Sequence, residues 1–153
     1  MNLLLSLSDD TQPEWLDAPT RRVLATIAAG LPPDGRVVGL VVVGDEEMRV
    51  INRDFRSVDA PTDVLSFSYL DEGEPLEAGD PVGEIYVSAQ TVEREARELN
   101  VDVRHLFLRV GVHGLLHVLG HHHADETEAE HMERAERSLL LSFLDADDVE
   151  RLF

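Results

Sequence analysis

The chain has 153 residues, the size of one domain with a substantial buried core. Its formal net charge is −18 and its basic residues are all arginine, which argues against broad nonspecific binding to nucleic acid but leaves room for a local basic groove. It contains no cysteine, so disulfides and thiolate ligands are excluded, and any metal ion must be bound through nitrogen or oxygen.

The first half of the chain alternates apolar runs with helical patterns. Asn2–Ser8 predicts a first strand, and because it lacks the basic start and the length of a signal peptide or a membrane span, we expect a cytoplasmic location. Thr20–Leu31 has apolar residues at helical spacing. Arg36–Val43 is rich in β-branched residues and predicts a buried central strand. Asp45 then fits the N-cap of a helix that ends near Arg56.

The second half predicts two strands and three helices. The strands are Thr62–Tyr69 and Gly83–Ala89, and between them Leu70–Pro81 is acidic and rich in Gly and Pro, which predicts a mobile loop. The expected helices are a segment from Ser88 or Gln90 to about Asn100, then Val101–Leu119, then Glu126–Leu144. Together these elements predict one α/β (α+β) domain over residues 1–153, with a small mixed sheet of about four strands, helices packed on it and a central helix that carries histidines.

The stretch His113–His123, HGLLHVLGHHH, holds five of the seven histidines of the protein. His113 and His117 are four residues apart, so a helix places both side chains on one face, where they can bind one metal ion together. His123 would point elsewhere if the helix continued, but Gly120 can adopt the left-handed conformation that ends a helix. Three imidazoles and one open position form the usual catalytic zinc site. We therefore expect one Zn²⁺ ion bound by these three histidines.

Two other interpretations of the stretch stay open. The three consecutive histidines could be an exposed polar run, although the leucines and valine between His113 and Gly120 indicate a buried segment in which imidazoles need partners. His121 would replace His123 as the third ligand if the helix continued through the glycine. A metal site remains the better explanation, because the glycine falls where the chain must turn.

The spacing also matches the metalloprotease pattern HExxHxxGxxH, except at one position. Gly114 stands where those proteases have the glutamate that acts as general base. We therefore expect metal-assisted hydrolysis of a bond other than a peptide bond.

A second group of polar residues lies in the segment Ile51–Phe67, INRDFRSVDAPTDVLSF. Arg56, near a helix end, offers a planar guanidinium that suits a phosphate. Asp63 could cap a helix, orient a histidine or bind the water of a metal ion. From the residues alone, an ordinary surface salt bridge between Arg56 and Asp59 or Asp63 is the more frequent arrangement.

Four segments carry a resemblance to a known family: INRDFR…PTDVLSF, GEIYVS, HGLLHVLGHHH and HMERAE. In order and spacing they resemble the YbeY family, bacterial endoribonucleases of ribosomal RNA maturation, over roughly Asp45 to Leu140. The resemblance implies an α/β fold, one zinc ion bound by His113, His117 and His123, and Arg56 as the arginine important for RNA cleavage. It also implies a cytoplasmic enzyme of single-stranded RNA, acting in 3′-end maturation of 16S (small-subunit) rRNA and in ribosome quality control, with the small subunit or its assembly factors as partners.

The chain departs from the family pattern inside the histidine stretch. The family motif ends in Gly-Tyr-Asp-His, whereas here His121 and His122 replace the Tyr and the Asp. A role of that Asp beside the metal is therefore in question, and His122 is a candidate to donate a proton or to crowd the ion.

The expected reaction is cleavage of an RNA phosphodiester, in which zinc polarises a phosphate oxygen or activates water and Arg56 offsets the charge of the transition state. The general base stays open between zinc-bound hydroxide, the RNA 2′-OH and His122. Two alternatives remain. A zinc-dependent hydrolase of a peptide or amide bond would need Asp63 or Glu84 at the ion, and a ribosome-assembly binding protein with a structural zinc would need a fourth protein ligand.

Overall fold

The computed structural model describes residues 1–70 and 79–153. The predicted loop Leu70–Pro81 therefore falls mostly on residues 71–78, outside the described part of the chain. The described elements are, in chain order, β1 (Asn2–Leu7), α1 (Ala18–Ala29), β2 (Val37–Val43), α2 (Asp45–Arg56), β3 (Val64–Ser68), β4 (Pro81–Ser88), α3 (Ala89–Leu99), α4 (Val103–Val118), α5 (Glu126–Leu140) and α6 (Ala146–Arg151).

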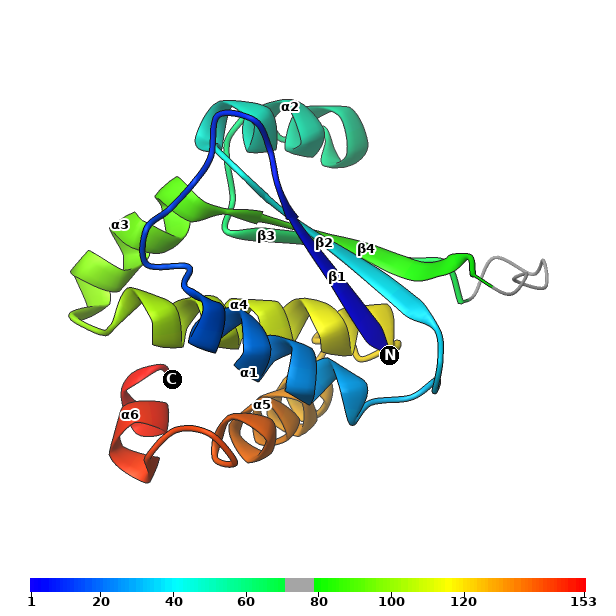
Figure 1. Ribbon diagram of the computed structural model, residues 1–153, viewed down its shortest axis with the longest axis vertical. Helices are drawn as coiled ribbons and strands as arrows, with labels where there is room; N and C mark the ends of the chain where they lie inside the picture. The colour runs from blue at the N-terminus through cyan, green and yellow to red at the C-terminus, as the bar shows by residue number, and fades with distance from the viewer. Residues whose placement is uncertain (71–78) are drawn as a thin grey trace.

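The four described strands form one mixed sheet in the order β1-β2-β4-β3 (Figure 1). β1, β2 and β4 run parallel, and β3 pairs antiparallel with β4. β2 lies inside the sheet, and its Val38, Leu40 and Val42 are fully buried. This confirms the buried central strand that the β-branched run predicted. Among the described residues β3 pairs with β4 alone, so the other side of β3 is an edge of the described sheet.

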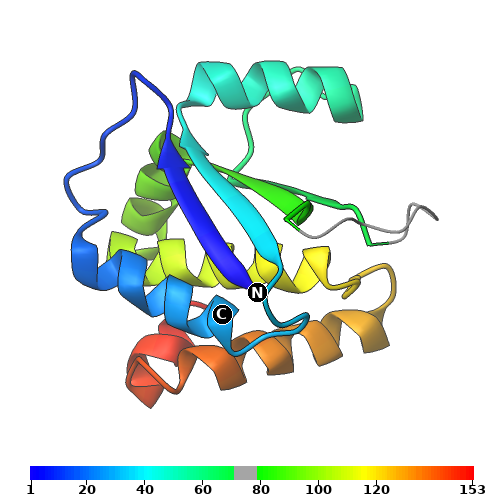
Figure 2. The ribbon, with the colours of Figure 1, turned by 45° about the vertical axis from the view of Figure 1, so that its right-hand side comes forward.

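The two faces of the sheet are covered differently. Figures 1 and 2 show α2 alone above the sheet, while α1, α4 and α5 lie below it. α4 packs against β3 and β4 and also contacts α1, α3 and α5. Its Phe107, Val112, Leu115 and Val118 are fully buried. This confirms the prediction of an apolar central helix that carries histidines. Among the described residues, no helix combines the length and the apolar character needed to cross a membrane.

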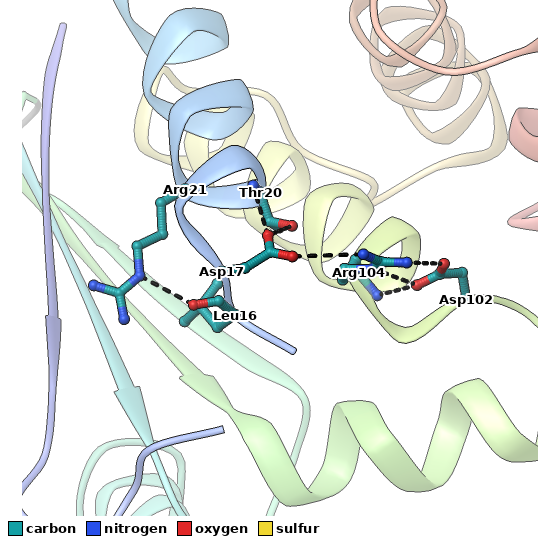
Figure 3. A network of polar contacts seen from close by, with 6 residues as sticks. All are labelled: Leu16, Asp17, Thr20, Arg21, Asp102 and Arg104. Atoms are coloured by element: carbon teal, nitrogen blue, oxygen red, sulfur yellow. Dashed lines mark hydrogen bonds and ion pairs between the residues drawn. The ribbon is translucent and has the colours of Figure 1, made fainter. Parts of the chain in front are cut away.

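The start of α4 is tied to the start of α1 by polar contacts (Figure 3). Asp102 caps α4, because its Oδ1 accepts a hydrogen bond of 2.8 Å from the backbone N–H of Arg104. Asp17 caps α1 in the same way, with Thr20 as the donor at 3.0 Å. The guanidinium of Arg104 contacts both carboxylates, at 3.0 Å for Asp102 and 3.5 Å for Asp17, and it lowers the pKa of Asp102. The ion pairs are exposed and stabilise little, but the caps define where both helices begin.

Two details of the fold differ from the predictions. Asp45 is the first residue of α2 and not its N-cap, which is Gly44. The Asp45 carboxylate instead accepts hydrogen bonds from Ser88 at 2.7 Å and from Thr91 at 2.6 Å, so it joins the starts of α2 and α3. The last predicted helix, Glu126–Leu144, is shorter than expected because α5 ends at Leu140, and the short helix α6 beyond it was not predicted.

Candidate metal centre

The last two turns of α4 carry His113 and His117. Both side chains are half-buried, and their Nε2 atoms lie 3.1 Å apart. The helical spacing of four residues thus places two imidazole nitrogens against each other, as the sequence predicts. A tetrahedral zinc ion separates two of its nitrogen ligands by roughly 3.3 Å. The observed separation fits two ligands of one ion.

Gly120 turns the chain directly after α4. Its φ of +97° is a left-handed conformation that glycine adopts without strain. The N–H of Gly120 donates to the carbonyl of His117 at 3.0 Å, and the N–H of His121 donates to that of Leu116 at 2.9 Å. These two hydrogen bonds form a Schellman motif, which ends the helix. The turn that the glycine predicts is therefore present.

The turn brings His123 back to the pair on α4. Its ring lies 5.7 Å from that of His113 and 5.0 Å from that of His117, measured between centroids. One nitrogen from each of the three rings lies within 4.8 Å of the other two. Of the described residues, this group includes His123 and not His121, which is exposed.

The three imidazoles suit a borderline-soft divalent metal such as zinc. Burial lowers the pKa of His117 to about 4, and repulsion from His113 and His123 adds to this effect. The ring is therefore neutral at pH 7 and its lone pair is free to bind a metal. Within residues 1–70 and 79–153, no fourth histidine or carboxylate joins the group, so these residues leave one coordination position open, as in catalytic zinc sites.

A buried carboxylate from α5 supports His113. The Nδ1 atom of His113 lies 2.5 Å from Oε1 of Glu136, whose side chain is only 4% exposed. A carboxylate accepts hydrogen bonds, so Nδ1 carries the proton and Nε2 is left as the metal-binding atom. Arg109 lies on the other side of Glu136, 3.9 Å from Oε2.

The sequence analysis did not find Glu136, although two signals point to it. It lies between Met132 and Leu140 at spacings of four residues, on the buried face of α5, where an acidic residue needs a partner. It is also the last residue of the HMERAE segment.

Gly114 faces the sheet and not the metal group. A Cβ atom at this position would lie 2.8 Å from Cγ2 of Ile85 in β4. A glutamate at this position would therefore begin in the packed interface between α4 and the sheet. The protein lacks the protease base, and its packing also leaves no room for one at this position.

We expect Gly114→Ala to destabilise the protein by about 1–2 kcal/mol. Alanine gains roughly 0.5–1 kcal/mol of helix propensity over glycine, but overpacking a dense core costs about 1–3 kcal/mol. Urea unfolding of the two proteins measures the difference. An equal or higher midpoint for the variant would show that Ile85 moves aside freely.

Arg56 ends α2 and its side chain is exposed. Within the described residues it forms no ion pair or side-chain hydrogen bond. The salt bridge considered for it is not formed, because Asp59 pairs with Arg49, and Asp63 accepts from the backbone N–H of Val64 at 2.8 Å. α2, which ends at Arg56, lies on one side of the sheet, and α4, which carries His113 and His117, lies on the other side (Figure 2).

The other predicted residues, Asp63, His122 and Glu84, lie outside the histidine group. Asp63 lines a small pocket of about 190 Å³ beside His113, together with Arg109 and Glu95. His122 is exposed, and its ring centroid is 6.5 Å from that of His117. Glu84 hydrogen-bonds the hydroxyl of Tyr86 and faces α2. Neither carboxylate belongs to the histidine group, as the alternative peptide hydrolase would require.

Comparison with known proteins agrees with this geometry. The family model described as Endoribonuclease YbeY matches residues 8–144. The Endoribonuclease YbeY of Allorhizobium ampelinum is 38% identical over 136 residues, which cover 82% of this chain and 79% of the relative. That of Rhodospirillum rubrum is 40% identical over 128 residues, 77% of this chain but only 64% of the relative.

A solved structure has the same fold. The solution structure of a Thermotoga maritima protein matches with a TM-score of 0.58 and 27% identity, over 96% of this chain and 95% of the other. The family model covers most of the chain, including β2, α4 and α5. The chain therefore belongs to the YbeY family of endoribonucleases.

Proposed function

We propose that this protein is a zinc-dependent endoribonuclease that cleaves single-stranded RNA. The observation that carries the proposal is the group of His113, His117 and His123, in which Glu136 leaves Nε2 of His113 available to a metal. Family membership supplies the reaction class. Gly114, packed against Ile85, argues against hydrolysis by the protease route.

Each part of the site has a distinct task in this proposal. A zinc ion bound by the three histidines would supply Lewis-acid chemistry at a phosphate oxygen or at water. Glu136 holds the proton on Nδ1 of His113 and fixes the orientation of the ring. His122 is exposed beside His117, where its imidazole can accept or donate a proton. Arg56, free of partners among the described residues, binds an RNA phosphate.

We further propose that the natural substrate is the 3′ region of 16S rRNA and that the protein acts in the cytoplasm, in ribosome quality control, with the small subunit or its assembly factors as partners. The support is the resemblance of the segments around Arg56 and the histidines to the family. The net charge of −18 is consistent with a partner that brings the RNA to the enzyme.

We expect Arg56→Ala to weaken RNA binding, and so to raise the KM of cleavage, about 10–100-fold, the usual effect of losing a hydrogen bond between two charged groups. The assay uses zinc-loaded protein and a labelled single-stranded RNA. Arg22→Ala is the matched control, since Arg22 is also an exposed arginine on a helix.

Three outcomes separate the parts of the proposal. Full activity of Arg56→Ala would remove Arg56 from the reaction. Equal cleavage of single strands and of a duplex of the same sequence would contradict strand specificity. Failure of the zinc-loaded wild-type protein to cleave any RNA would contradict the proposed activity.

A further inference from the structure

A pocket lined by aromatic side chains lies between α2 and the sheet, on the opposite face from the histidines. Its volume is about 470 Å³. Its lining includes Ile51 and Phe55 from α2, Phe67 and Tyr69 from β3 or just after it, and Glu84 and Tyr86 from β4. We call it the aromatic pocket. None of the three residues of the histidine group lines it.

Three rings of the pocket are arranged edge to face. The centroids of Phe55 and Phe67 are 5.0 Å apart, and those of Phe67 and Tyr86 are 6.0 Å apart. Phe67 and Tyr86 are partly buried against the small core under α2. Phe55 is different, because 70% of its surface is exposed. One flat apolar face is therefore left open to a ligand, at the rim of a pocket that already contains aromatic rings.

Folding alone does not account for the exposure of Phe55. On α2, Met48 is buried and Ile51 is half-buried, and Phe55 continues this stripe one turn further. It contacts Phe67 at the side of the sheet near the β3 edge. A polar residue would cost the fold little at this position. An exposed aromatic ring is typical of surfaces on which a planar ligand stacks.

Polar groups around the pocket suit a nucleotide. Arg56 follows Phe55 directly, is exposed, and makes no ion pair with a described residue. Arg56 does not line the pocket and projects about 100° from Phe55 around the helix, but its long side chain can reach a phosphate that follows a base in the pocket. Inside the pocket, Glu84 accepts a hydrogen bond of 3.1 Å from the Tyr86 hydroxyl. The remaining acceptor capacity of this carboxylate suits the N–H groups at the edge of a nucleobase.

The β3 edge of the described sheet separates the aromatic pocket from the histidine group. Phe67 faces α2 above the sheet, whereas Ser68 donates a hydrogen bond of 2.7 Å to the carbonyl of Val118 in α4 below it. Val64, at the other end of β3, lines the small pocket beside His113. A single strand that crosses the β3 edge can therefore place a base on one face while its backbone reaches the histidines on the other.

We propose that the aromatic pocket binds a nucleobase of single-stranded RNA, with Phe55 stacked on the base and Arg56 on the adjacent phosphate. The choice of RNA rests on the proposed endoribonuclease function. Stacking is especially useful in this protein, because a net charge of −18 opposes the electrostatic attraction on which most RNA-binding proteins rely. A duplex hides its bases, so the pocket also provides a reason for single-strand specificity.

The test is binding of a fluorescently labelled, nuclease-resistant single-stranded RNA to the zinc-loaded protein. We expect Phe55→Ala to raise the dissociation constant about 10-fold, the loss of one base–aromatic stacking contact. Phe55→Trp keeps a stacking surface and should bind at least as well as the wild type. Phe143→Ala is the matched control, because Phe143 is also an exposed phenylalanine, after α5, and should bind like the wild type.

An RNA with abasic sites makes the test specific for bases. Removing the bases should weaken binding to the wild type and have a smaller effect on Phe55→Ala. The proposal would be overturned if Phe55→Ala bound RNA with wild-type affinity, or if abasic sites lowered the affinity of both proteins equally. The pocket would then take an apolar ligand of another class. If the wild type cleaves RNA and Phe55→Ala binds RNA as tightly as the wild type, the proposed function stands and the proposed role of the pocket fails. If binding depends on the bases and on Phe55 but no RNA is cleaved, the proposed role of the pocket stands and the proposed endoribonuclease function fails.

Discussion

His117→Ala is expected to abolish zinc binding and RNA cleavage, the largest effect that we expect of any single substitution. The ring is neutral at pH 7 because its pKa is lowered to about 4, and its Nε2 lies 3.1 Å from that of His113. Losing a direct ligand should reduce metal affinity by more than the roughly 100-fold that follows the loss of an outer hydrogen-bond partner. Zinc per chain by elemental analysis, and cleavage of labelled single-stranded RNA, measure the two effects.

His131→Ala is the matched control, since His131 is an exposed histidine on α5 outside the histidine group. It should retain the zinc content and the activity of the wild type. His121→Ala and His123→Ala, compared in the same assay, identify the third ligand. The structure predicts that His123→Ala loses zinc and that His121→Ala keeps it. The reverse result would place the ion away from the observed histidine group.

Chelation of the wild-type protein provides a second check on the same site. Removing the metal should reproduce the activity of His117→Ala, and added zinc should restore only the wild type. If chelated protein cleaved RNA at the full rate, the histidine group would have no part in the reaction.

Features set by local sequence were predictable. The β-branched run of β2 and the apolar residues of α4 define their elements without reference to the rest of the chain. The turn after α4 was also predictable, because Gly120 suits a left-handed conformation that other residues rarely adopt. The spacing of four residues and the glycine predicted the pair and the turn, but the structure was needed to place His123, and not His121, beside the pair.

Features set by tertiary packing were not predictable in the same way. Asp45 looked like a helix cap, but Ser88 and Thr91, more than forty positions along the chain, provide its partners. The residues alone suggested a surface salt bridge between Arg56 and Asp59 or Asp63, but Asp59 pairs with Arg49 of α2 instead. The aromatic pocket depends on how α2 lies over β3 and β4, and no spacing within α2 or β3 encodes that arrangement.

Glu136 is the clearest example of this limit. It lies 23 positions from His113, and the two meet only because α5 packs along α4. An acidic residue on the buried face of an amphipathic helix is nevertheless a recognisable signal, since an unpaired buried carboxylate would be costly. The sequence can therefore indicate that Glu136 has a partner, but only the structure identifies the partner as a histidine of the candidate site.

Glu136→Leu is expected to lower zinc affinity about 10–100-fold and to lower the stability of the metal-free protein by about 1–3 kcal/mol. The loss of affinity follows because Nδ1 of His113 loses the acceptor that fixes its proton and its orientation. Stability should fall because the substitution removes only one partner of a buried polar contact and leaves the half-buried Nδ1–H of His113 without its acceptor, which costs about 1–3 kcal/mol. Arg109 keeps its other contacts, a hydrogen bond to the carbonyl of Leu152 and the ring of Phe153.

Measuring the two effects separately distinguishes a role of Glu136 in metal binding from a role in folding. Glu136→Gln should be intermediate in zinc affinity, because its amide oxygen still accepts the hydrogen bond but without a negative charge. Competition with a chelating dye measures affinity, and urea unfolding in the absence of metal measures stability. Glu130→Leu, at an exposed position of α5, should leave zinc affinity unchanged. If Glu136→Leu lost stability but kept its zinc affinity, the contact with His113 would serve the packing of α5 on α4 and not the metal site.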